Sequence, residues 1–217
     1  MKRRTTNIAL VGISASVGLA LAFSISVRAE GTLDTPSAAV QMAVFDRASS
    51  PQDALPTRAA DLALTEQPAG VPDALYEGNW QIGQSRLLAA TARGASLYAV
   101  PTDRGAVCYA ITAGDGAGGG CVSSLDKGRP LSVSVYDPDE PNSGVPPTVG
   151  GLVSSDTDTV KVLVNGEEYE ATVQNNAYLY SLVDTHSYPS EVIVSHRDGS
   201  TATSEIPDPR SVMEKIQ

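Results

Sequence analysis

The two cysteines of this chain, Cys108 and Cys121, are the residues whose type and spacing predict chemistry most directly. Redox-active pairs commonly use a C-x-x-C spacing, which this sequence lacks. An even number of cysteines predicts a disulfide instead if the chain is exported to an oxidising compartment, as its N-terminal residues predict. The bond would close a loop of fourteen residues and contribute about 3 kcal/mol to stability. We expect it to join two strands that flank a glycine-rich loop at residues 114–120.

The two histidines, His186 and His196, are the candidates for a general base. Asp184 and Asp198 lie near them in the sequence and serines are abundant, but no G-x-S-x-G motif is present. His186 falls in a polar loop and His196 at the end of an expected strand, so we expect both to be exposed. With Asp184 they supply too few ligands for a closed zinc site. We therefore expect no catalytic residue, and the alternative is a secreted hydrolase whose histidine-containing site no motif reveals.

Acidic loops are the remaining candidates for a site. Ca²⁺ prefers oxygen ligands, and two loops are rich in them: Asp137, Asp139, Glu140 and Asn142 in one, Asp156 and Asp158 in the other. Prolines interrupt the first loop, which does not match the D-x-[DN]-x-[DN]-G pattern. We favour solvated turns and keep a weak Ca²⁺ site as an alternative. The glycine stretch leads into Cys121 rather than a lysine and a helix, so it predicts no phosphate site, and we expect no cofactor.

The N-terminal segment predicts export. Three basic residues at positions 2–4 precede a run without charge at residues 8–27, and Arg28 follows it. A run of this length favours a membrane anchor over a cleaved signal, although cleavage after Ala29 is the alternative. In either case residues 30–217 would be extracytoplasmic. The anchor would hold the protein in the cell membrane, and cleavage would release it.

Composition and charge narrow the class of partner. The chain is 41% hydrophobic and 18% charged, which excludes wholesale disorder. Its net charge is −10, and removing residues 1–29 removes four basic and no acidic residues, which leaves −14. A nucleic-acid partner is excluded because it would need a basic face. The expected partner is therefore an envelope protein or a cell-wall polymer.

The elements that would position these residues change along the chain. Residues 30–84 are rich in alanine and proline and predict a helical spacer, with helices at 36–48, from Pro51, and at 58–64. From Arg86 onward the hydrophobic period becomes two, with turn residues every eight to twelve positions. The expected tight turns include Asn165-Gly166, Asn175-Asn176 and Arg197-Asp198-Gly199. Strands are expected at 86–91, 95–101, 106–112, 131–136, 148–153, 159–164, 168–173, 177–183, 191–196 and 201–206.

These patterns predict a mainly β fold: an antiparallel sandwich or barrel-like domain, or two small β modules, preceded by short helices and a hydrophobic N-terminal helix. The expected division is 1–29 anchor or signal, 30–84 spacer, 85–137 two-cysteine β region, 148–206 Ig-like β region and 207–217 tail. Leu131, Val133 and Val135 should form the buried face of a half-buried strand. Tyr178 and Tyr180 share a face that is either core or a platform for stacking sugars, and the pattern does not decide between them.

Several short motifs carry a resemblance to known proteins. They are Ser85-Arg86-Leu87-Leu88, Leu97-Tyr98-Ala99-Val100-Pro101, Val107-Cys108-Tyr109, Gly119-Gly120-Cys121, Val164-Asn165-Gly166 and Asn175-Asn176-Ala177-Tyr178. Over residues 85–206 the chain resembles a group of uncharacterised exported or membrane-anchored bacterial proteins. Members of this group have a two-cysteine β region followed by a second β region. The resemblance implies an envelope protein, and it transfers no activity and no functional residue.

Taken together, the sequence predicts a non-enzymatic envelope protein that acts as a structural or interaction module. The alternatives are the secreted hydrolase and a weak Ca²⁺- or carbohydrate-binding module. These three functions differ in the site they require: a surface without reactive groups, a base in contact with a nucleophile, or a recess lined by polar ligands.

Overall fold

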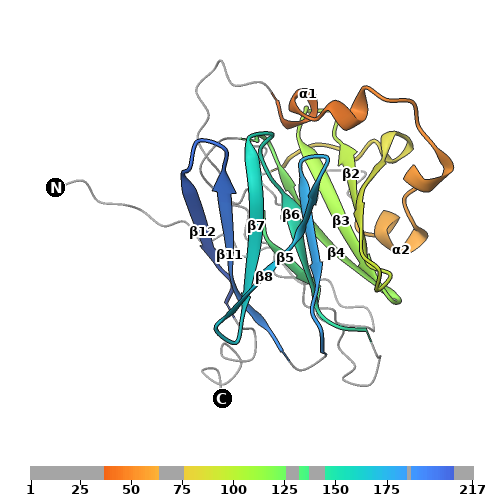
Figure 1. Cartoon of the computed structure of the whole chain (residues 1–217). Helices are drawn as coiled ribbons and strands as arrows, with labels where there is room; N and C mark the ends of the chain where they lie inside the picture. Colours follow the sequence, from red (N-terminus) through yellow and green to blue (C-terminus); the bar gives the residue numbers. More distant parts are fainter. Residues whose placement is uncertain (1–36, 64–75, 126–131, 137–144, 185–186, 208–217) are drawn as a thin grey trace.

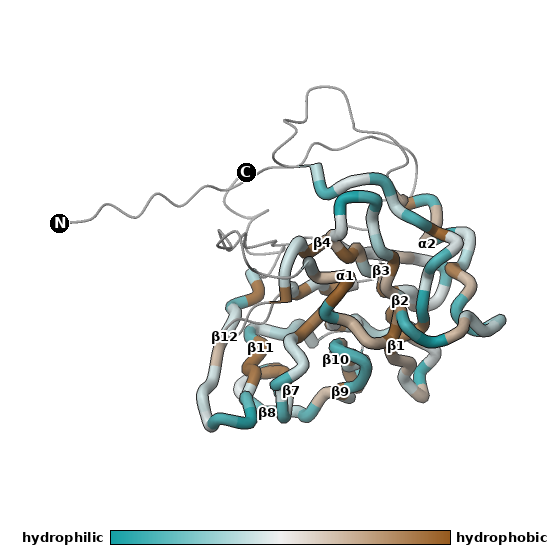
Figure 2. Tube along the Cα trace, turned by 90° about the horizontal axis from the view of Figure 1, so that it is seen from above, coloured by the Kyte–Doolittle hydropathy of each residue, from teal (hydrophilic) through white to brown (hydrophobic). Residues whose placement is uncertain are grey.

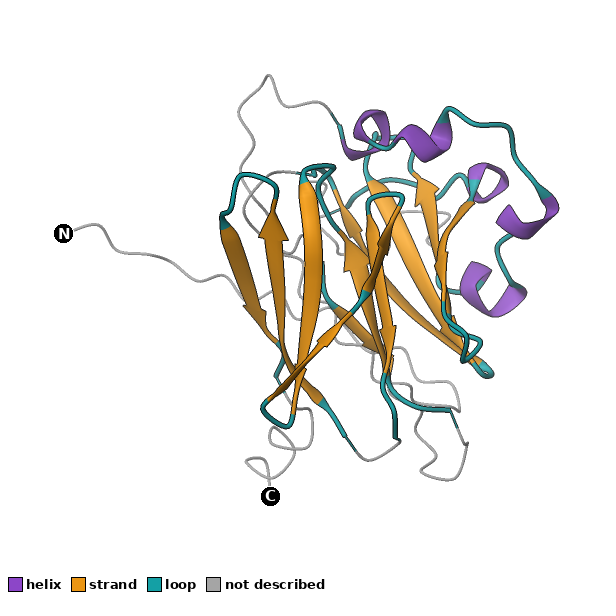
Figure 3. Cartoon of the chain, viewed as in Figure 1, coloured by secondary structure: helices purple, strands orange, loops and turns teal. Residues whose placement is uncertain are grey.

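The computed structural model describes residues 37–63, 76–125, 132–136, 145–184 and 187–207. Within these residues the fold is mainly β, as expected, with three antiparallel sheets packed against one another in layers (Figure 1 and Figure 3). The sheets are open, so the barrel alternative is wrong. The expected N-terminal hydrophobic helix, the acidic loop from Asp137 to Asn142, His186 and residues 208–217 lie outside the described residues. None of the helices in the described part is long and apolar enough to cross a membrane.

Each sheet contains four strands. The first has the order β1-β2-β3-β4, the middle one β5-β6-β10-β9, and the outer one β12-β11-β7-β8. The strands are β1 (Arg86–Ala90), β2 (Ser96–Pro101), β3 (Val107–Ala113), β4 (Gly116–Val122), β5 (Ser134–Tyr136), β6 (Thr148–Leu152), β7 (Thr157–Val164), β8 (Glu167–Glu170), β9 (Thr172–Gln174), β10 (Ala177–Ser181), β11 (Pro189–His196) and β12 (Thr201–Glu205). The middle sheet pairs β5 with β6, so it joins segments from the two expected β regions.

The middle sheet is buried on both faces, and this creates two hydrophobic cores. On β10, Leu179 belongs to the core shared with the first sheet, whereas Tyr178 belongs to the core shared with the outer sheet. Neighbouring residues of a strand point to opposite faces, so each must find an apolar partner. The outer sheet supplies alternate valines to the second core: Val160, Val162, Val164, Val192 and Val194. The fold is therefore a stack of three layers.

Burial on both faces also corrects the expectation for residues 131–136. Val133 and Val135 are buried as predicted, but Ser132 and Ser134 are buried as well, and Leu131 lies outside the described residues. The serines are tolerated because they are hydrogen-bonded: the Ser132 hydroxyl accepts from the Leu152 N–H at 2.9 Å. The Ser134 hydroxyl lies 2.7 Å from the Tyr109 hydroxyl. This strand is therefore interior rather than half-buried.

The glycine stretch is a strand and not the expected loop. Residues of β4 from Gly116 to Gly120 pair with β3 in an unbroken antiparallel register. A Cβ added at Gly119 would lie 2.0 Å from the backbone oxygen of Tyr109, so no side chain fits there. Glycine is unfavourable in an isolated strand but allows this close approach of two backbones. The prediction failed because composition was interpreted without the partner strand.

The expected strand at 168–173 is instead divided between two sheets. β8 pairs with β7 in the outer sheet, and β9 pairs with β10 in the middle sheet. Ala171 lies between β8 and β9, is buried, and donates its N–H to the Val160 carbonyl at 2.8 Å. The chain thus crosses from one layer to the next at Ala171. A continuous period-two pattern did not reveal this because each half remains locally a strand.

The segment before the sheets forms short turns of helix rather than a long helix at 36–48. It contains α1 (Ala38–Gln41), η1 (Ala43–Phe45), η2 (Pro51–Asp53), α2 (Thr57–Ala60) and, after residues that are not described, η4 (Ile82–Gln84). The long helix is interrupted at Met42, which has φ −103° and ψ 101° and is only 1% exposed in the first core. Burying Met42 against the first sheet therefore takes precedence over continuing the helix.

Asp53 attaches this segment to the first sheet. Its buried carboxylate accepts two hydrogen bonds from the Arg47 guanidinium, at 2.6 and 2.7 Å. It also accepts from the Ser50 N–H and hydroxyl, at 2.8 and 2.9 Å, and from the Leu87 N–H on β1 at 2.9 Å. The Arg47 guanidinium, more than any other group, holds the pKa of Asp53 well below its usual range.

We predict that Asp53→Asn lowers the free energy of unfolding at pH 7 by about 2–3 kcal/mol, because buried donors lose a charged acceptor. A lowered pKa means that the carboxylate stabilises the fold above its unfolded-state pKa, near 4. The difference between wild type and variant should therefore shrink as the pH falls below about 4. Urea unfolding over a pH series measures this. The control is Asp61→Asn at an exposed carboxylate, and an equal loss in both variants would contradict the prediction.

A second prediction concerns the packing of the middle sheet. A Cβ at Gly151 of β6 would lie 1.9 Å from the backbone oxygen of Ser132, so Gly151→Ala should cost about 3 kcal/mol. The matched control is Gly83→Ala in η4, where an added Cβ meets nothing within 4 Å. Thermal unfolding should show a clearly lower Tm for the first variant and an unchanged or slightly higher Tm for the second. Similar Tm values for both would refute the close packing.

Candidate functional site

The predicted disulfide is present. Cys108 and Cys121 are bonded and occupy directly opposite positions of β3 and β4, with their Cα atoms 3.9 Å apart. Cys108 is completely buried. The bond therefore links the two strands of one hairpin in register, and does not enclose an unstructured glycine loop. With no free thiol in the chain, the cysteines supply no nucleophile.

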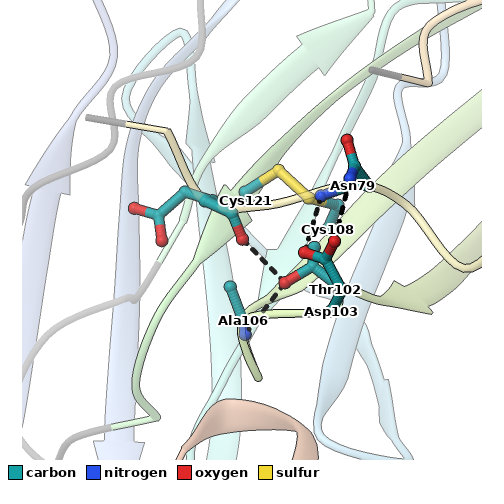
Figure 4. Close-up of a disulfide and its surroundings, with 7 residues drawn as sticks. Asn79, Thr102, Asp103, Ala106, Cys108 and Cys121 are labelled. Atoms are coloured by element: carbon teal, nitrogen blue, oxygen red, sulfur yellow. Dashed lines mark hydrogen bonds between the residues drawn. A yellow bond between two sulfur atoms is a disulfide. The ribbon is translucent and has the colours of Figure 1, made fainter. Parts of the chain in front are cut away.

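The surroundings of the disulfide are a hydrogen-bonded turn (Figure 4). The Asp103 carboxylate accepts from the backbone and side-chain N–H groups of Asn79, at 2.9 and 2.8 Å. The Thr102 hydroxyl accepts from the Ala106 N–H at 3.1 Å and donates to the Glu77 carbonyl at 2.7 Å. These bonds fix the β2–β3 turn next to the disulfide. Their role is structural, because every named polar group in this turn already has a protein partner.

His196 is buried, which corrects the expectation that it is exposed. It ends β11 and is only 4% exposed, and neither ring nitrogen has a hydrogen-bond partner. Its Nδ1 lies 3.6 Å from Oδ1 of Asp156. The two residues are far apart in sequence but meet because the end of β11 pairs with the start of β7. Sequence reasoning missed this neighbour because only the strand register brings them together.

Ser154 completes this cluster, but its order does not suit nucleophilic catalysis. The Ser154 hydroxyl donates to Oδ1 of Asp156, the same atom that faces His196. Asp156 thus lies between the serine and the histidine. A hydrolytic triad requires the histidine in the middle, where it takes the proton from the serine. His196 therefore has no contact through which it would activate Ser154.

Apart from Asp158, which is exposed on β7, the other acidic candidates act as turn acceptors or lie outside the described residues. Asp184 accepts from the Ser187 N–H and hydroxyl, and Asp198 accepts from the N–H and hydroxyl of Ser200. Asp137, Asp139, Glu140 and Asn142 are not described. Within the described ranges, no group of three or more His, Cys, Asp or Glu residues is placed to hold a metal ion. The Ca²⁺ alternative therefore gains no support from these ranges.

The two tyrosines of β10 form no exposed platform. Tyr178 is fully buried and donates its hydroxyl to the Ser132 carbonyl at 2.9 Å, and burial raises the pKa of this phenol well above its usual value. Tyr180 is half-buried and stacks on Tyr169 of β8, with ring centroids 5.7 Å apart. Both side chains pack in or against the second core, so the core interpretation is correct for Tyr178.

Within the part of the chain that the structure describes, a candidate for a binding site is an open groove of about 330 Å³ between the middle and outer sheets. It lies where β6 ends, β7 begins, and the β9–β10 and β11–β12 turns meet, at the upper end of the molecule in Figure 1. Figure 2, seen from that end, shows the β9–β10 turn as strongly hydrophilic. The lining residues are Val153, Ser154, Ser155, Thr157, Asp158, Val173, Gln174, Asn175, Asn176 and Arg197. Of the sequence candidates, only Asp158 lines this groove, and no motif pointed to the others.

We predict that the free energy of unfolding of the double variant Cys108→Ala/Cys121→Ala is about 3 kcal/mol lower than that of the oxidised wild type. The reason is that the unfolded chain regains the freedom that the bond removes. Thermal unfolding with and without reductant measures this. Reductant should lower the Tm of the wild type and leave that of the double variant unchanged, which separates loss of the bond from loss of packing. A wild-type Tm that reductant does not change, with both thiols free by mass, would contradict the prediction.

Comparisons with protein-family models, with curated proteins and with solved structures found no match to this chain. The family resemblance suggested by the short motifs therefore stays a prediction. The function has to be inferred from the structure itself. Its relevant features are a disulfide-bonded hairpin, a buried histidine that does not contact a serine, and a polar groove between two sheets.

Proposed function

We propose that this protein is an exported, non-enzymatic interaction module of a bacterial envelope. It would be held at the membrane by residues 8–27, or released if cleaved after Ala29, and would contact an envelope protein or a cell-wall polymer. The observation that carries this proposal is the Cys108–Cys121 disulfide between two paired strands. Disulfides of this structural kind persist in oxidising compartments and are rare in the cytosol.

The distribution of polar groups supports a binding role over a catalytic one. The buried polar contacts at Asp53 and at Ser132 join one layer or segment to another. The one cluster that combines serine, aspartate and histidine has the aspartate in the middle. A rigid body of three layers would present its turns and outer sheet as fixed surfaces, which lowers the entropic cost of binding.

Crosslinking in the native host tests the proposal. A photo-crosslinking residue is placed at Thr203 on β12, at Ser155 in the groove, or at Asp61 after α2, all of them exposed. At least one position should give a reproducible adduct with an envelope protein or cell-wall material, and the chain should fractionate with the envelope. The three positions lie on different surfaces, so each serves as a control for the others.

Two results would overturn the proposal. One is a chain that fractionates with the cytosol and has both thiols reduced. The other is turnover of a chromogenic ester or glycoside that His196→Gln abolishes while the Tm stays unchanged, because this would assign a catalytic role to the buried imidazole. We expect His196→Gln to change no such activity.

A further inference from the structure

We propose that the groove between the middle and outer sheets is a saccharide-binding site that recognises its ligand by hydrogen bonds rather than by ring stacking. This inference deepens the proposed function, since it names the polymer class and the surface that contacts it. The groove has a volume of about 330 Å³, at the small end of the range for ligand sites. It therefore suits a short saccharide or the end of a chain.

The first argument is the density of planar polar groups. The lining contains a carboxylate, three side-chain amides and a guanidinium, from Asp158, Gln174, Asn175, Asn176 and Arg197. Each of these groups presents two adjacent hydrogen-bonding atoms in one plane. Neighbouring hydroxyls of a sugar ring offer a matching pair of atoms to the side chains of Asp158, Gln174 and Arg197, whereas the amides of Asn175 and Asn176 already donate to backbone carbonyls. Ser154, Ser155 and Thr157 complete the lining, and of these three Ser155 is exposed while the buried Ser154 hydroxyl donates to Asp156.

The second argument is the pair of opposite charges. Asp158 at the start of β7 and Arg197 after β11 are both exposed, and the structure gives neither side chain an ion pair within the described ranges. A carboxylate only accepts hydrogen bonds and a guanidinium only donates them. A hydroxyl does both, so a polyhydroxylated ligand satisfies the two groups at once. A simple anion or cation would satisfy one and be repelled by the other.

The third argument is that one wall of the groove is already fixed. The Asn175 side-chain amide donates to the Leu88 carbonyl of the first sheet at 2.9 Å, and that of Asn176 donates to the Val153 carbonyl at 3.3 Å. Both residues have positive φ, 51° and 61°, as a tight turn requires. The turn is therefore tied to two other segments before any ligand arrives, which reduces the ordering cost of binding.

The apolar part of the lining decides the mode of recognition. Only Val153 and Val173 contribute apolar side chains, and no aromatic residue lines the groove. Tyr178 and Tyr180, which the sequence offered as a stacking platform, pack in or against the second core instead. Ring stacking is thus absent here, and binding depends on hydroxyl contacts. The site should accordingly prefer ligands with several adjacent hydroxyls and bind them weakly.

Saturation-transfer difference NMR on the full chain tests the inference. The probes are maltose, cellobiose and N,N′-diacetylchitobiose, with the zwitterionic dipeptide Ala-Ala as a probe of a different class. We expect saturation transfer to at least one saccharide and none to the dipeptide. Asp158→Ala and Arg197→Ala should each weaken saccharide binding about tenfold. Asp61→Ala, at an exposed carboxylate away from the groove, should leave it unchanged. A thermal unfolding curve for each variant confirms that the fold is intact.

The outcomes separate this inference from the proposed function. No saccharide signal, a signal from the dipeptide alone, or saccharide binding that both groove variants retain would overturn the inference. Gln174→Ala, also on the groove, gives a further independent variant, and an unchanged affinity there would count against a bidentate amide contact. Crosslinks from Thr203 to an envelope protein would stand unaffected by any of these results, so the two proposals fail separately.

Discussion

The fold depends on a middle sheet that has no solvent-facing side. Because β6 and β10 are buried on both faces, every residue along them must pack closely against its neighbours. The chain meets this demand with glycine where the backbone of a neighbouring segment approaches closely, and with large apolar residues where a core must be filled. Gly151 admits the Ser132 backbone on one face, while Leu179 fills the core on the other. Two cores built on one sheet make the three layers interdependent.

Two further contacts hold the first layer in place. The Cys108–Cys121 bond fixes the register of β3 and β4, where a run of glycines provides few side-chain contacts of its own. Asp53 connects the short helical turns to the backbone of β1. One contact is covalent and the other ionic, and both join segments whose local sequence is poorly suited to an independent structure.

The polar groups at the other end of the molecule have a different distribution. At the start of β7, Asp156 is held by Ser154 and faces the buried ring of His196, whereas Asp158, two residues later, is exposed in the groove. Asp156 lies in the turn before β7, whereas Asp158 is the second residue of the strand, so the first carboxylate faces His196 and the second is exposed to solvent. The groove exists because the β9–β10 turn of the middle sheet ends beside the turns of the outer sheet.

Local pattern was enough to predict much of this protein: the period-two strands, the tight turns at Asn165-Gly166 and Asn175-Asn176, and the pairing of the only two cysteines. These features are determined by residues that are close in the sequence. The alternation of side chains and the residue types at turns therefore show them directly. Only the tertiary structure decided that the glycines form a strand, that residues 168–173 divide at Ala171, and that His196 is buried. Each of these depends on a strand from another part of the chain. Contacts between side chains of different layers leave no periodic pattern in the sequence. The groove is lined by residues from several separate segments, so the sequence alone did not reveal it.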